Sequence, residues 1–303
     1  MNRGFFNGVS ICVFTYNFQD YLAQALDSIL SQKCTFPIEI IIGDDCSTDR
    51  TQSIAEEYQR LNPDIIRLSF NSTNVGGTQN WIRTIDQCNG RYIALLDGDD
   101  YFCDDYKLQK QYDALETDKQ YVLCTHTVCE RDQDGKLPDK IIEFSESEFT
   151  LEDILRKGWF IRTGSTFFKN GLLPSPIPEW VNNYPYRFDT ILHVFICVHG
   201  KVLNINKTMS VWRKHNKGTS LTFLEDKIAN LKTVIRLEEE LDRYTKGQFV
   251  DAIRSYVAEL NSYLFLFLLK SKRWWFYRKE LIDSFAKMKL AVIRQLVGEK
   301  LWK

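Results

Sequence analysis

The chain has 303 residues, of which 44% are hydrophobic and 26% are charged, and its formal net charge is −1. This composition is ordinary for a folded globular protein, and it excludes both extensive disorder and a protein that spans a membrane many times. The length exceeds that of an average domain, so it predicts either one large domain with an appendage or two domains.

Strands alternate with helices through the first hundred residues. Apolar runs at residues 9–15, 38–43, 65–69 and 91–96 have the length and content of buried strands, and amphipathic helices are predicted between them. This alternation is typical of βαβ units. We therefore predict an α/β fold with a mostly parallel central sheet flanked by helices.

The alternation loosens after residue 105. A helix is predicted at residues 107–116, a strand at 121–128, a helix that ends at Gly158 and a strand at 161–168. Each of these segments is bounded by polar or glycine-containing turns. The chain therefore continues as a less regular second half of the same domain.

The last part of the sequence changes character. A helix is predicted at residues 187–199, followed by two short strands at 201–205 and 208–212, and from residue 221 the pattern is helical only. We therefore predict a domain over residues 1–220 and a helical region over residues 221–303.

Polar residues follow each of the first four predicted strands. They are Tyr16 and Asn17, then Asp44 and Asp45, then Asn71, Asn74, Gly76 and Gly77, and finally Asp97, Gly98, Asp99 and Asp100. Ligands of open α/β sheets bind outside the carboxyl ends of the strands. The sequence has no glycine-rich phosphate loop, so a bound phosphate would need a cation, and Asp-Gly-Asp offers the carboxylates that Mg²⁺ or Mn²⁺ takes.

Other interpretations of the acidic run stay open at this point. Aspartates often cap turns without binding anything. A phosphatase of the haloacid dehalogenase type would place its Asp-x-Asp after the first strand, whereas here it follows the fourth, and Leu108 stands where an EF-hand would need a glutamate. A sugar-binding module without catalysis also fits the run.

Four segments resemble, in order and spacing, the motifs of the inverting family 2 glycosyltransferases, which have the GT-A fold. They are VSICVFTYN, IIIGDDCSTDRT, NVGGTQNW and YIALLDGDDYF, and the resemblance extends over about residues 9–220. It implies a nucleotide-sugar half at about residues 1–105 and an acceptor half at about 106–220. It also implies transfer of a sugar from a nucleoside diphosphate, a UDP-sugar, in the manner of enzymes that build bacterial surface polysaccharides.

The resemblance also implies roles for individual residues. Asp99 and His215 would hold Mn²⁺ or Mg²⁺, and Asp189 would be the catalytic base, although a carboxylate there could simply favour the start of a helix. The nucleotide sugar would contact Thr15, Tyr16, Asn17, Asp45, Asn74, Gly76, Asp97, Gly98 and Arg213. Asp45 would accept a hydrogen bond from the base, and Arg213 would lie near the phosphates.

The predicted partners are the nucleotide-sugar donor and a saccharide or lipid-linked acceptor. Residues 221–303 hold 16 basic and 11 acidic residues, a bias too small and local to predict nucleic acid. The aromatic cluster at residues 274–277, flanked by Lys and Arg, fits either peripheral contact with a membrane or packing against the catalytic domain or a second subunit. The eight cysteines form no CxxC pair and are predicted to be reduced and buried, which favours a cytoplasmic protein, with the inner face of the membrane as one location.

Overall fold

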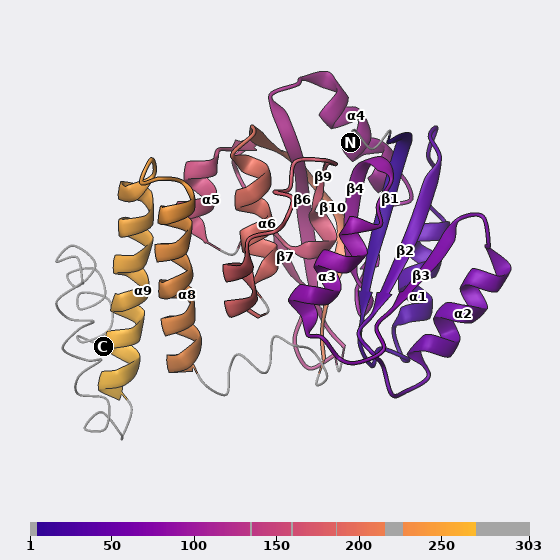
Figure 1. Cartoon of the computed structure of the whole chain (residues 1–303), viewed down its shortest axis with the longest axis horizontal. Helices are drawn as coiled ribbons and strands as arrows, with labels where there is room; N and C mark the ends of the chain where they lie inside the picture. The colour runs from indigo at the N-terminus through magenta and orange to yellow at the C-terminus, as the bar shows by residue number, and fades with distance from the viewer. Residues whose placement is uncertain (1–4, 134, 159, 186, 216–226, 271–303) are drawn as a thin grey trace. The chain divides into compact units, whose positions relative to one another are not determined.

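The structure, a computed structural model, describes residues 5–133, 135–158, 160–185, 187–215 and 227–270. It divides into two compact units. The first unit comprises Met1–Leu151 and Trp159–Gly218, and the second comprises Glu152–Gly158 and Thr219–Lys303. The first unit holds the central sheet, and the second is helical (Figure 1).

The first half of the sheet is parallel, as the alternation of strands and helices predicts. Its strands are β1 (Phe6–Thr15), β2 (Ile38–Asp44), β3 (Ile66–Phe70) and β4 (Gly90–Asp97). The helices that connect them are α1 (Leu22–Leu30), α2 (Thr51–Leu61) and α3 (Gly77–Asp86). The spatial order is β3-β2-β1-β4. β2 and β3 therefore lie on one side of β1, and β4 lies on the other side.

The second half of the sheet is mixed. It contains β5 (Tyr101–Phe102), β6 (Tyr121–Asp132), β7 (Lys140–Ile142), β8 (Glu148–Phe149), β9 (Phe167–Lys169) and β10 (Lys201–Lys214). Beyond β4 the order continues β9-β6-β10-β5. The helices of this half are α4 (Lys107–Thr117), the 3₁₀ turns η1 (Thr163–Ser165) and η2 (Glu179–Asn183), and α6 (Phe188–Cys197). Figure 1 shows α3 and α6 on the side of the sheet that faces the viewer.

The directions of the strands determine which edge of the sheet carries the polar residues that follow them. β9 pairs antiparallel with both β4 and β6, and β10 pairs parallel with β6. β10 therefore runs in the same direction as β4. Its carboxyl end lies at the same edge of the sheet as the ends of β1 to β4.

Two predicted segments differ from the structure. Residues 161–168 are not one strand, because Thr163–Ser165 form a 3₁₀ turn and only Phe167–Lys169 pair in the sheet. The two strands predicted at 201–205 and 208–212 are one strand, β10, whose pairing with β6 shifts register between Ile205 and Thr208. This register shift lets one strand accommodate the polar residues that interrupt its apolar pattern.

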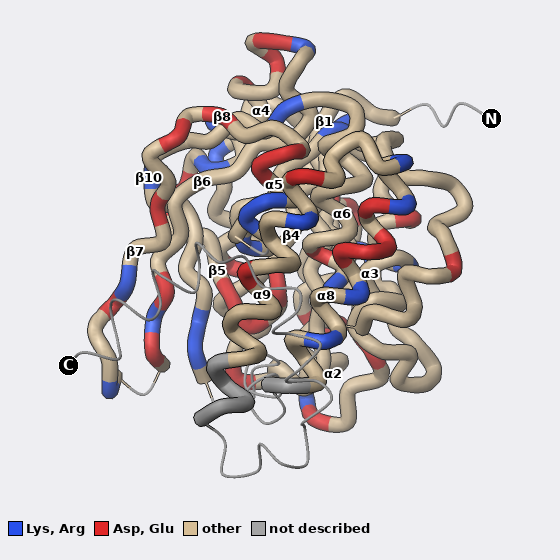
Figure 2. Tube along the Cα trace, turned by 90° about the vertical axis from the view of Figure 1, so that its left-hand side faces the viewer, with Lys and Arg blue, Asp and Glu red and all other residues tan. Residues whose placement is uncertain are grey.

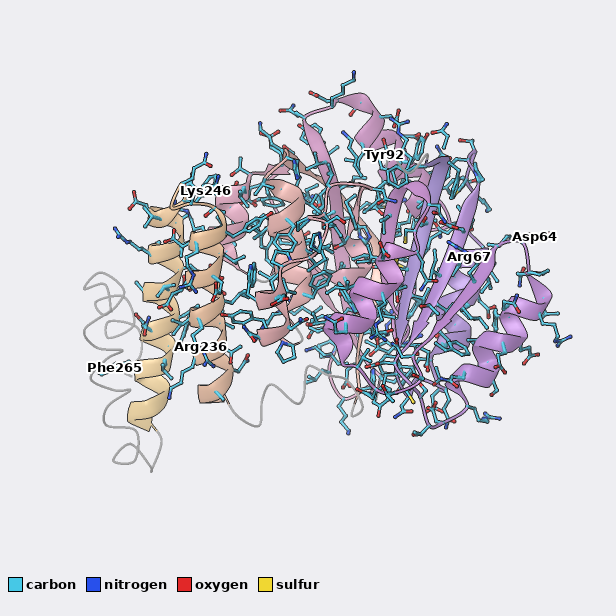
Figure 3. The ribbon with its side chains drawn as sticks, viewed as in Figure 1. Asp64, Arg67, Tyr92, Arg236, Lys246 and Phe265 are labelled. Carbon is cyan, nitrogen blue, oxygen red and sulfur yellow. The ribbon has the colours of Figure 1, made fainter. Side chains whose placement is uncertain are left out.

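The core lies between the sheet and its helices. Most side chains of β1, β2 and β4 are buried because helices cover the sheet, which explains their continuous apolar runs. Tyr92 of β4 is one of the largest buried side chains, stacks on Phe167 at 5.3 Å between ring centroids, and stands among packed side chains in Figure 3. The core thus fixes the strands that carry the polar ends.

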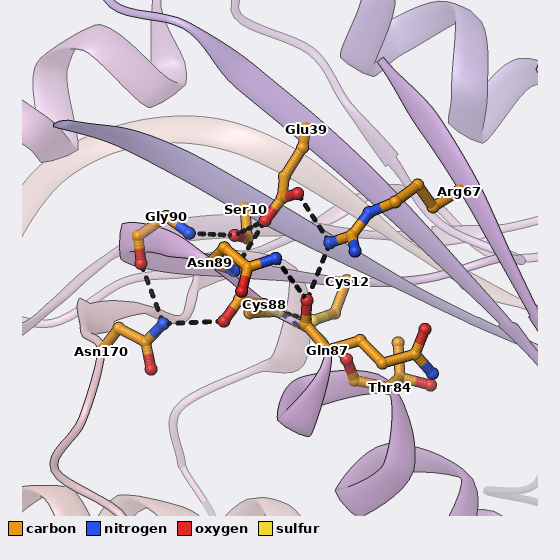
Figure 4. A network of polar contacts seen from close by, with 10 residues as sticks. All are labelled: Ser10, Cys12, Glu39, Arg67, Thr84, Gln87, Cys88, Asn89, Gly90 and Asn170. Atoms are coloured by element: carbon orange, nitrogen blue, oxygen red, sulfur yellow. Dashed lines mark hydrogen bonds and ion pairs between the residues drawn. The ribbon is translucent and has the colours of Figure 1, made fainter. Parts of the chain in front are cut away.

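A polar network joins four parallel strands at the end of the sheet opposite those polar ends (Figure 4). Glu39 of β2 accepts from the Ser10 hydroxyl of β1 at 2.5 Å and pairs with Arg67 of β3 at 2.6 Å. The Ser10 hydroxyl in turn accepts from the Gly90 amide of β4 at 2.8 Å. These bonds fix the relative positions of the strands along their length, and so they align the strand ends at the other edge.

The helical unit contains α5 (Leu151–Lys157), α8 (Lys227–Tyr244) and α9 (Val250–Lys270). α5 ends at Gly158, whose φ of +65° favours glycine, as predicted from the sequence. α8 and α9 pack together through a small apolar cluster that includes Ile235, Leu260 and Leu264. The aromatic and basic cluster at residues 274–277 lies outside the described residues.

Two further expectations concern cysteines and membranes. Five of the eight cysteines are buried, but Cys34 and Cys46 are half-buried and Cys103 is exposed, so the prediction that all are buried is wrong for these three. Across the described part of the chain, no helix combines the length and the apolar character that crossing a membrane requires.

Candidate functional site

The ends of β1 and β4 meet where the strand order reverses direction. In open α/β sheets a ligand crevice forms at such a point, because the connections after the two strands leave in opposite directions. Gly98 follows β4 and donates its amide to the carbonyl of Phe14 at 2.7 Å. A Cβ at Gly98 would lie 3.1 Å from both that carbonyl oxygen and the Cβ of Thr15. Gly98 therefore favours the close approach of the two strand ends, because a side chain there would crowd the end of β1.

The connection after β1 presents an aromatic ring. Asn17 has a φ of +57°, its amide donates to the Ser47 hydroxyl, and its side-chain oxygen accepts from the Thr48 amide. These contacts tie the end of β1 to the loop after β2. Tyr16, just before this turn, is 43% exposed, and Thr15 is buried with no partner for its hydroxyl among the described residues. Thr15, Tyr16 and Asn17 thus lie together at the predicted nucleotide edge.

The two aspartates after β2 are bound by the protein itself. Asp44 is fully buried and accepts from the Ser47 amide at 2.8 Å and from the Gln52 side chain at 2.6 Å. Asp45 accepts from the amides of Val75 and Gly76 at 2.8 and 2.9 Å. Asp44 therefore caps a turn, and Asp45 holds the loop that precedes α3.

That loop contains the predicted residues Asn74 and Gly76. Gly76 has a φ of +85° and precedes α3, and no atom of the described residues lies within 4 Å of the position that a Cβ would take there. Its need for glycine is therefore conformational rather than steric. The side chain of exposed Asn74 accepts from the Gly76 amide at 3.2 Å. Both residues adjoin Asp45, so the structure brings these three predictions together.

The carboxylates after β4 differ in their surroundings from those after β2. The pKa of Asp97 is raised to about 8 by burial and, to a smaller degree, by the charges of Asp99 and Asp189, against a hydrogen bond from Thr163. Burial, followed by the charges of Asp99 and Asp97, raises the pKa of Asp100 well above its usual range. Carboxyl groups that repel one another in this way favour a bound cation or proton.

The end of β10 supplies the groups that face these carboxylates. β5 runs back antiparallel to β10, with Tyr101 opposite Val211, and this brings Arg213 and His215 beside the acidic turn. The Nε2 atom of His215 lies 2.9 Å from Oδ2 of Asp99, and their side chains are 2% and 14% exposed. The Arg213 amide donates to Asp100 at 2.8 Å, and its guanidinium donates to the Asp99 carbonyl. Arg213 thus supports the turn that carries Asp99.

Asp189 lies in the first turn of α6 and is within electrostatic reach of Asp97. Its Oδ1 accepts from the Thr190 amide at 2.7 Å, and a carboxylate in the first turn also interacts favourably with the helix dipole. Trp81 of α3 stacks on Phe14 at 4.2 Å and contacts the ring of Phe188 at 6.1 Å. These rings link the start of α6 to the end of β1, so Asp189 belongs to the same site as the strand-end residues.

Sequence reasoning missed two residues of this site. Thr163 bonds to Asp97, and Arg162 lies close enough to Asp189 for the carboxylate to raise the pKa of the guanidinium, against the larger lowering by burial. Both stand at the 3₁₀ turn that the sequence predicted as strand. Gly164 inside that pattern was the available signal, because a glycine within a strand pattern often marks a close backbone approach.

The geometry of Asp99 and His215 suits a divalent cation. In the described part of the chain, no group of three or more His, Cys, Asp or Glu side chains could hold a metal by itself. Two ligand atoms 2.9 Å apart nevertheless match neighbouring positions of an octahedral ion. Metal–oxygen bonds of about 2.1 Å put adjacent ligands about 3 Å apart, and Mg²⁺ usually completes its shell with phosphate oxygens and water.

Comparison with known proteins identifies the family. Residues 10–171, more than half of the chain, match Glycosyl transferase family 2. The chain belongs to this family. It is 34% identical over 210 residues to the uncharacterized protein Rv1520 of Mycobacterium tuberculosis, an alignment that covers 69% of this chain. The chain spans 60% of the length of that relative.

Two solved structures share the fold of this family 2 chain. Staphylococcus aureus TarS 1-349 in complex with UDP-GlcNAc superposes with a TM-score of 0.64 and 19% identity, covering 91% of this chain and 79% of that one. The mannosyltransferase PcManGT from Pyrobaculum calidifontis, in complex with GDP-Man and Mn²⁺, gives a TM-score of 0.61 and 15% identity, covering 99% and 82%. The predicted GT-A fold is confirmed.

Proposed function

We propose that the protein transfers a sugar from a nucleoside diphosphate donor, a UDP-sugar, to a hydroxyl of a saccharide or lipid-linked acceptor with inversion at the anomeric carbon. The observation that carries this proposal is the pairing of Asp99 with His215, 2.9 Å apart, at the strand edge to which Asp189 also belongs. Family membership and the complexes of TarS with UDP-GlcNAc and of PcManGT with GDP-Man and Mn²⁺ support it.

Asp99 and His215 would hold Mn²⁺ or Mg²⁺ between them. When bound, such an ion would neutralise charge on the leaving diphosphate. Arg213 holds the backbone at Asp99 and adds a positive charge behind that ligand. Asp45 keeps lone pairs beyond those used by the Val75 and Gly76 amides, so it can still accept from a base N–H.

Asp189 would act as the base. The acceptor hydroxyl would attack the anomeric carbon, its proton would pass to the Asp189 carboxylate, and the bond to the diphosphate oxygen would break on the opposite face. Displacement in one step inverts the configuration. A phosphatase or a sugar-binding module would not need this carboxylate, and the family match disfavours the phosphatase.

The first test separates binding from chemistry. Asp189→Asn is expected to lower the transfer rate by about 100-fold or more while leaving the affinity for UDP and Mn²⁺ unchanged, because it removes only the base. Asp99→Ala is expected to weaken UDP binding in the presence of Mn²⁺. Calorimetric titration with UDP and Mn²⁺ and transfer from a panel of UDP-sugars measure the two effects.

A matched control checks that these effects are local. Asp113→Asn alters an exposed carboxylate on α4, away from the site, and should change neither property. Full transferase activity in both site variants would overturn the assignment. Thermal shifts with UDP and GDP in Mn²⁺ would identify the nucleotide, because a ligand that binds only the native state raises its stability.

The acceptor would determine where the reaction takes place. A lipid-linked acceptor would put it at the cytoplasmic face of the membrane. Sedimentation of the whole chain with liposomes that contain anionic lipid tests this, and sedimentation independent of the anionic lipid would contradict a role for the basic residues beyond Lys270.

A further inference from the structure

The start of α1 has two faces with different surroundings. One face packs in the core through Leu22, Ala25, Leu26 and Ile29. The other carries Phe18, Tyr21 and Gln24, which are less buried. The amides of Tyr21 and Leu22 both donate to the Phe18 carbonyl at 3.0 Å, so one helical turn extends from Phe18 to Leu22. Residues three apart lie on the same side of a helix, so Phe18, Tyr21 and Gln24 form one row.

This row contacts the end of β10. The ring of Tyr21 lies 4.4 Å from the imidazole of His215 between centroids, at an angle of 38°. The ring of Phe18 meets the same imidazole edge-on, at 6.1 Å and 85°. The side-chain oxygen of Gln24 accepts a hydrogen bond from the Arg213 guanidinium. The helical spacing of the row therefore matches the two residues of the β10 end that belong to the candidate site.

Aromatic rings from two elements also contact Arg213. Its guanidinium lies 5.4 Å from the centroid of the Tyr21 ring and 4.5 Å from that of Tyr101 in β5. The chain carries acidic positions, red in Figure 2, both where it enters β5 and where it leaves it. Arg213 is only 4% exposed, and a cation–π contact is stronger when the pair is removed from water. These contacts hold the end of β10 beside the acidic turn.

The backbone that carries the two rings is itself fixed. The amide of Phe18 donates to Oγ1 of Thr51 at 2.8 Å, and the amide of Gln19 donates to Oδ2 of Asp49 at 3.2 Å. Thr51 is the first residue of α2, and Asp49 lies just before it. Side chains carried by such a support position their neighbours more closely than side chains of a free loop. Phe18 and Tyr21 therefore offer His215 a rigid surface.

A histidine that binds a metal must direct one ring nitrogen at the ion. Groups around such a ligand fix its orientation, and their removal typically lowers metal affinity about 10- to 100-fold. The imidazole of His215 has Tyr21 against its face and Phe18 at its edge, and its Nε2 lies 2.9 Å from Oδ2 of Asp99. Contacts within the protein therefore orient this imidazole towards the acidic turn.

We propose that Tyr21, together with Phe18, is a positioning residue for the metal. The two rings hold the His215 imidazole with Nε2 directed at the ion that His215 would share with Asp99, and they thereby raise the affinity for Mn²⁺ or Mg²⁺. The inference rests on the proposed function, because it takes Asp99 and His215 as the metal ligands. Tyr21 acts through His215 and needs no contact of its own with the ion or the substrates.

The affinity for Mn²⁺ tests this role directly. Calorimetric titration of the full chain with Mn²⁺ in saturating UDP should give a Kd for Mn²⁺ that is about 10-fold higher in Tyr21→Ala than in the unmodified protein. Tyr21→Phe keeps the ring and should bind Mn²⁺ as tightly as the unmodified protein. Equal affinity of Tyr21→Ala and the unmodified protein, or an equal loss in Tyr21→Ala and Tyr21→Phe, would overturn the proposal.

A matched control separates this role from a general effect of losing a tyrosine ring. The ring of Tyr106 also lies near two cations, Lys33 at 5.3 Å and Lys110 at 5.7 Å, but it stands at the start of α4. Tyr106→Ala should leave the affinity for Mn²⁺ unchanged, and a loss equal to that of Tyr21→Ala would overturn the proposal. Melting curves check that each variant is folded at the titration temperature. If Tyr21→Ala is not, Tyr21→Leu replaces it with the same expected loss.

The result is separable from the proposed function. If Asp99→Ala weakens Mn²⁺ binding while Tyr21→Ala does not, the role of Tyr21 is wrong and the metal site stands. If Tyr21→Ala weakens Mn²⁺ binding while Asp189→Asn keeps full transferase activity, Tyr21 positions the ligand but Asp189 is not the base. Full Mn²⁺ affinity in Asp99→Ala would overturn both the metal site and the role of Tyr21. In the transfer reaction, Tyr21→Ala should regain the unmodified rate at saturating Mn²⁺, because only the affinity for the ion has changed.

Discussion

The aspartates after β2 and those after β4 differ in what occupies their oxygens, although both groups stand at the same edge of the sheet. Asp44 and Asp45 are satisfied by amides and side chains of neighbouring loops. Asp97 and Asp100 also have hydrogen-bond partners, but their pKa values are raised, because removal from water and the neighbouring carboxylates disfavour their charged forms. The carboxylates after β2 therefore stabilise loops. Those after β4 lower the stability of the protein without its ligand, and their surroundings suit a ligand.

The largest expected effect tests the acidic turn after β4. Asp99→Asn should lower the transfer rate in Mn²⁺ by about 100-fold or more, because it removes a charge next to the leaving diphosphate. The melting temperature of the metal-free protein should stay the same or rise, since one of the mutually repelling carboxylates is gone. A clear fall in melting temperature would show that Asp99 is structural and would remove the contrast with β2.

The second test concerns stability at the end of β2. Asp44→Ala leaves the Ser47 amide and the Gln52 side chain without their acceptor, and buried donors left unpaired typically cost about 1–3 kcal/mol each. Urea denaturation should show a loss of about 3 kcal/mol in the free energy of unfolding. Asp44→Asn keeps one acceptor oxygen and should lose less. Equal stability of Asp44→Ala and the unmodified protein would contradict a capping role.

A third test sharpens the contrast through pH. The pKa of Asp97 is about 8 in the folded protein against an ordinary value of 3.8. As pH rises through this window the unfolded chain releases the proton while the folded protein retains it, so Asp97 progressively lowers stability. Asp97→Asn removes this pH-dependent loss of stability.

The measurement compares melting curves of the two proteins in a chelator. The melting temperature of Asp97→Asn should exceed that of the unmodified protein by an amount that grows from pH 5 to pH 8 and then levels off. Parallel curves across this range would mean that Asp97 ionises normally in the folded state.

Much of the fold followed from the sequence because its signals are local. The apolar runs of β1, β2 and β4 and the amphipathic helices between them fix a parallel α/β arrangement through periodicity alone. The end of α5 at Gly158 could also be predicted, since a positive φ favours glycine. The prediction failed at residues 161–168, where a 3₁₀ turn packs against β4 and Gly164 was the local signal that the strand pattern is interrupted.

The sequence by itself determined which residue types stand at each strand end, and hence that acids, amides and glycines gather at one edge of a parallel sheet. Only the tertiary structure decided which groups each of those acids meets, because that depends on partners far away in the chain. The Asp99 carboxylate meets His215 across 116 residues, and Asp45 meets Gly76 across 31. Local sequence patterns predict which segments form strands and which side chains are buried. The pairing of charges depends instead on how the completed sheet brings distant strands together.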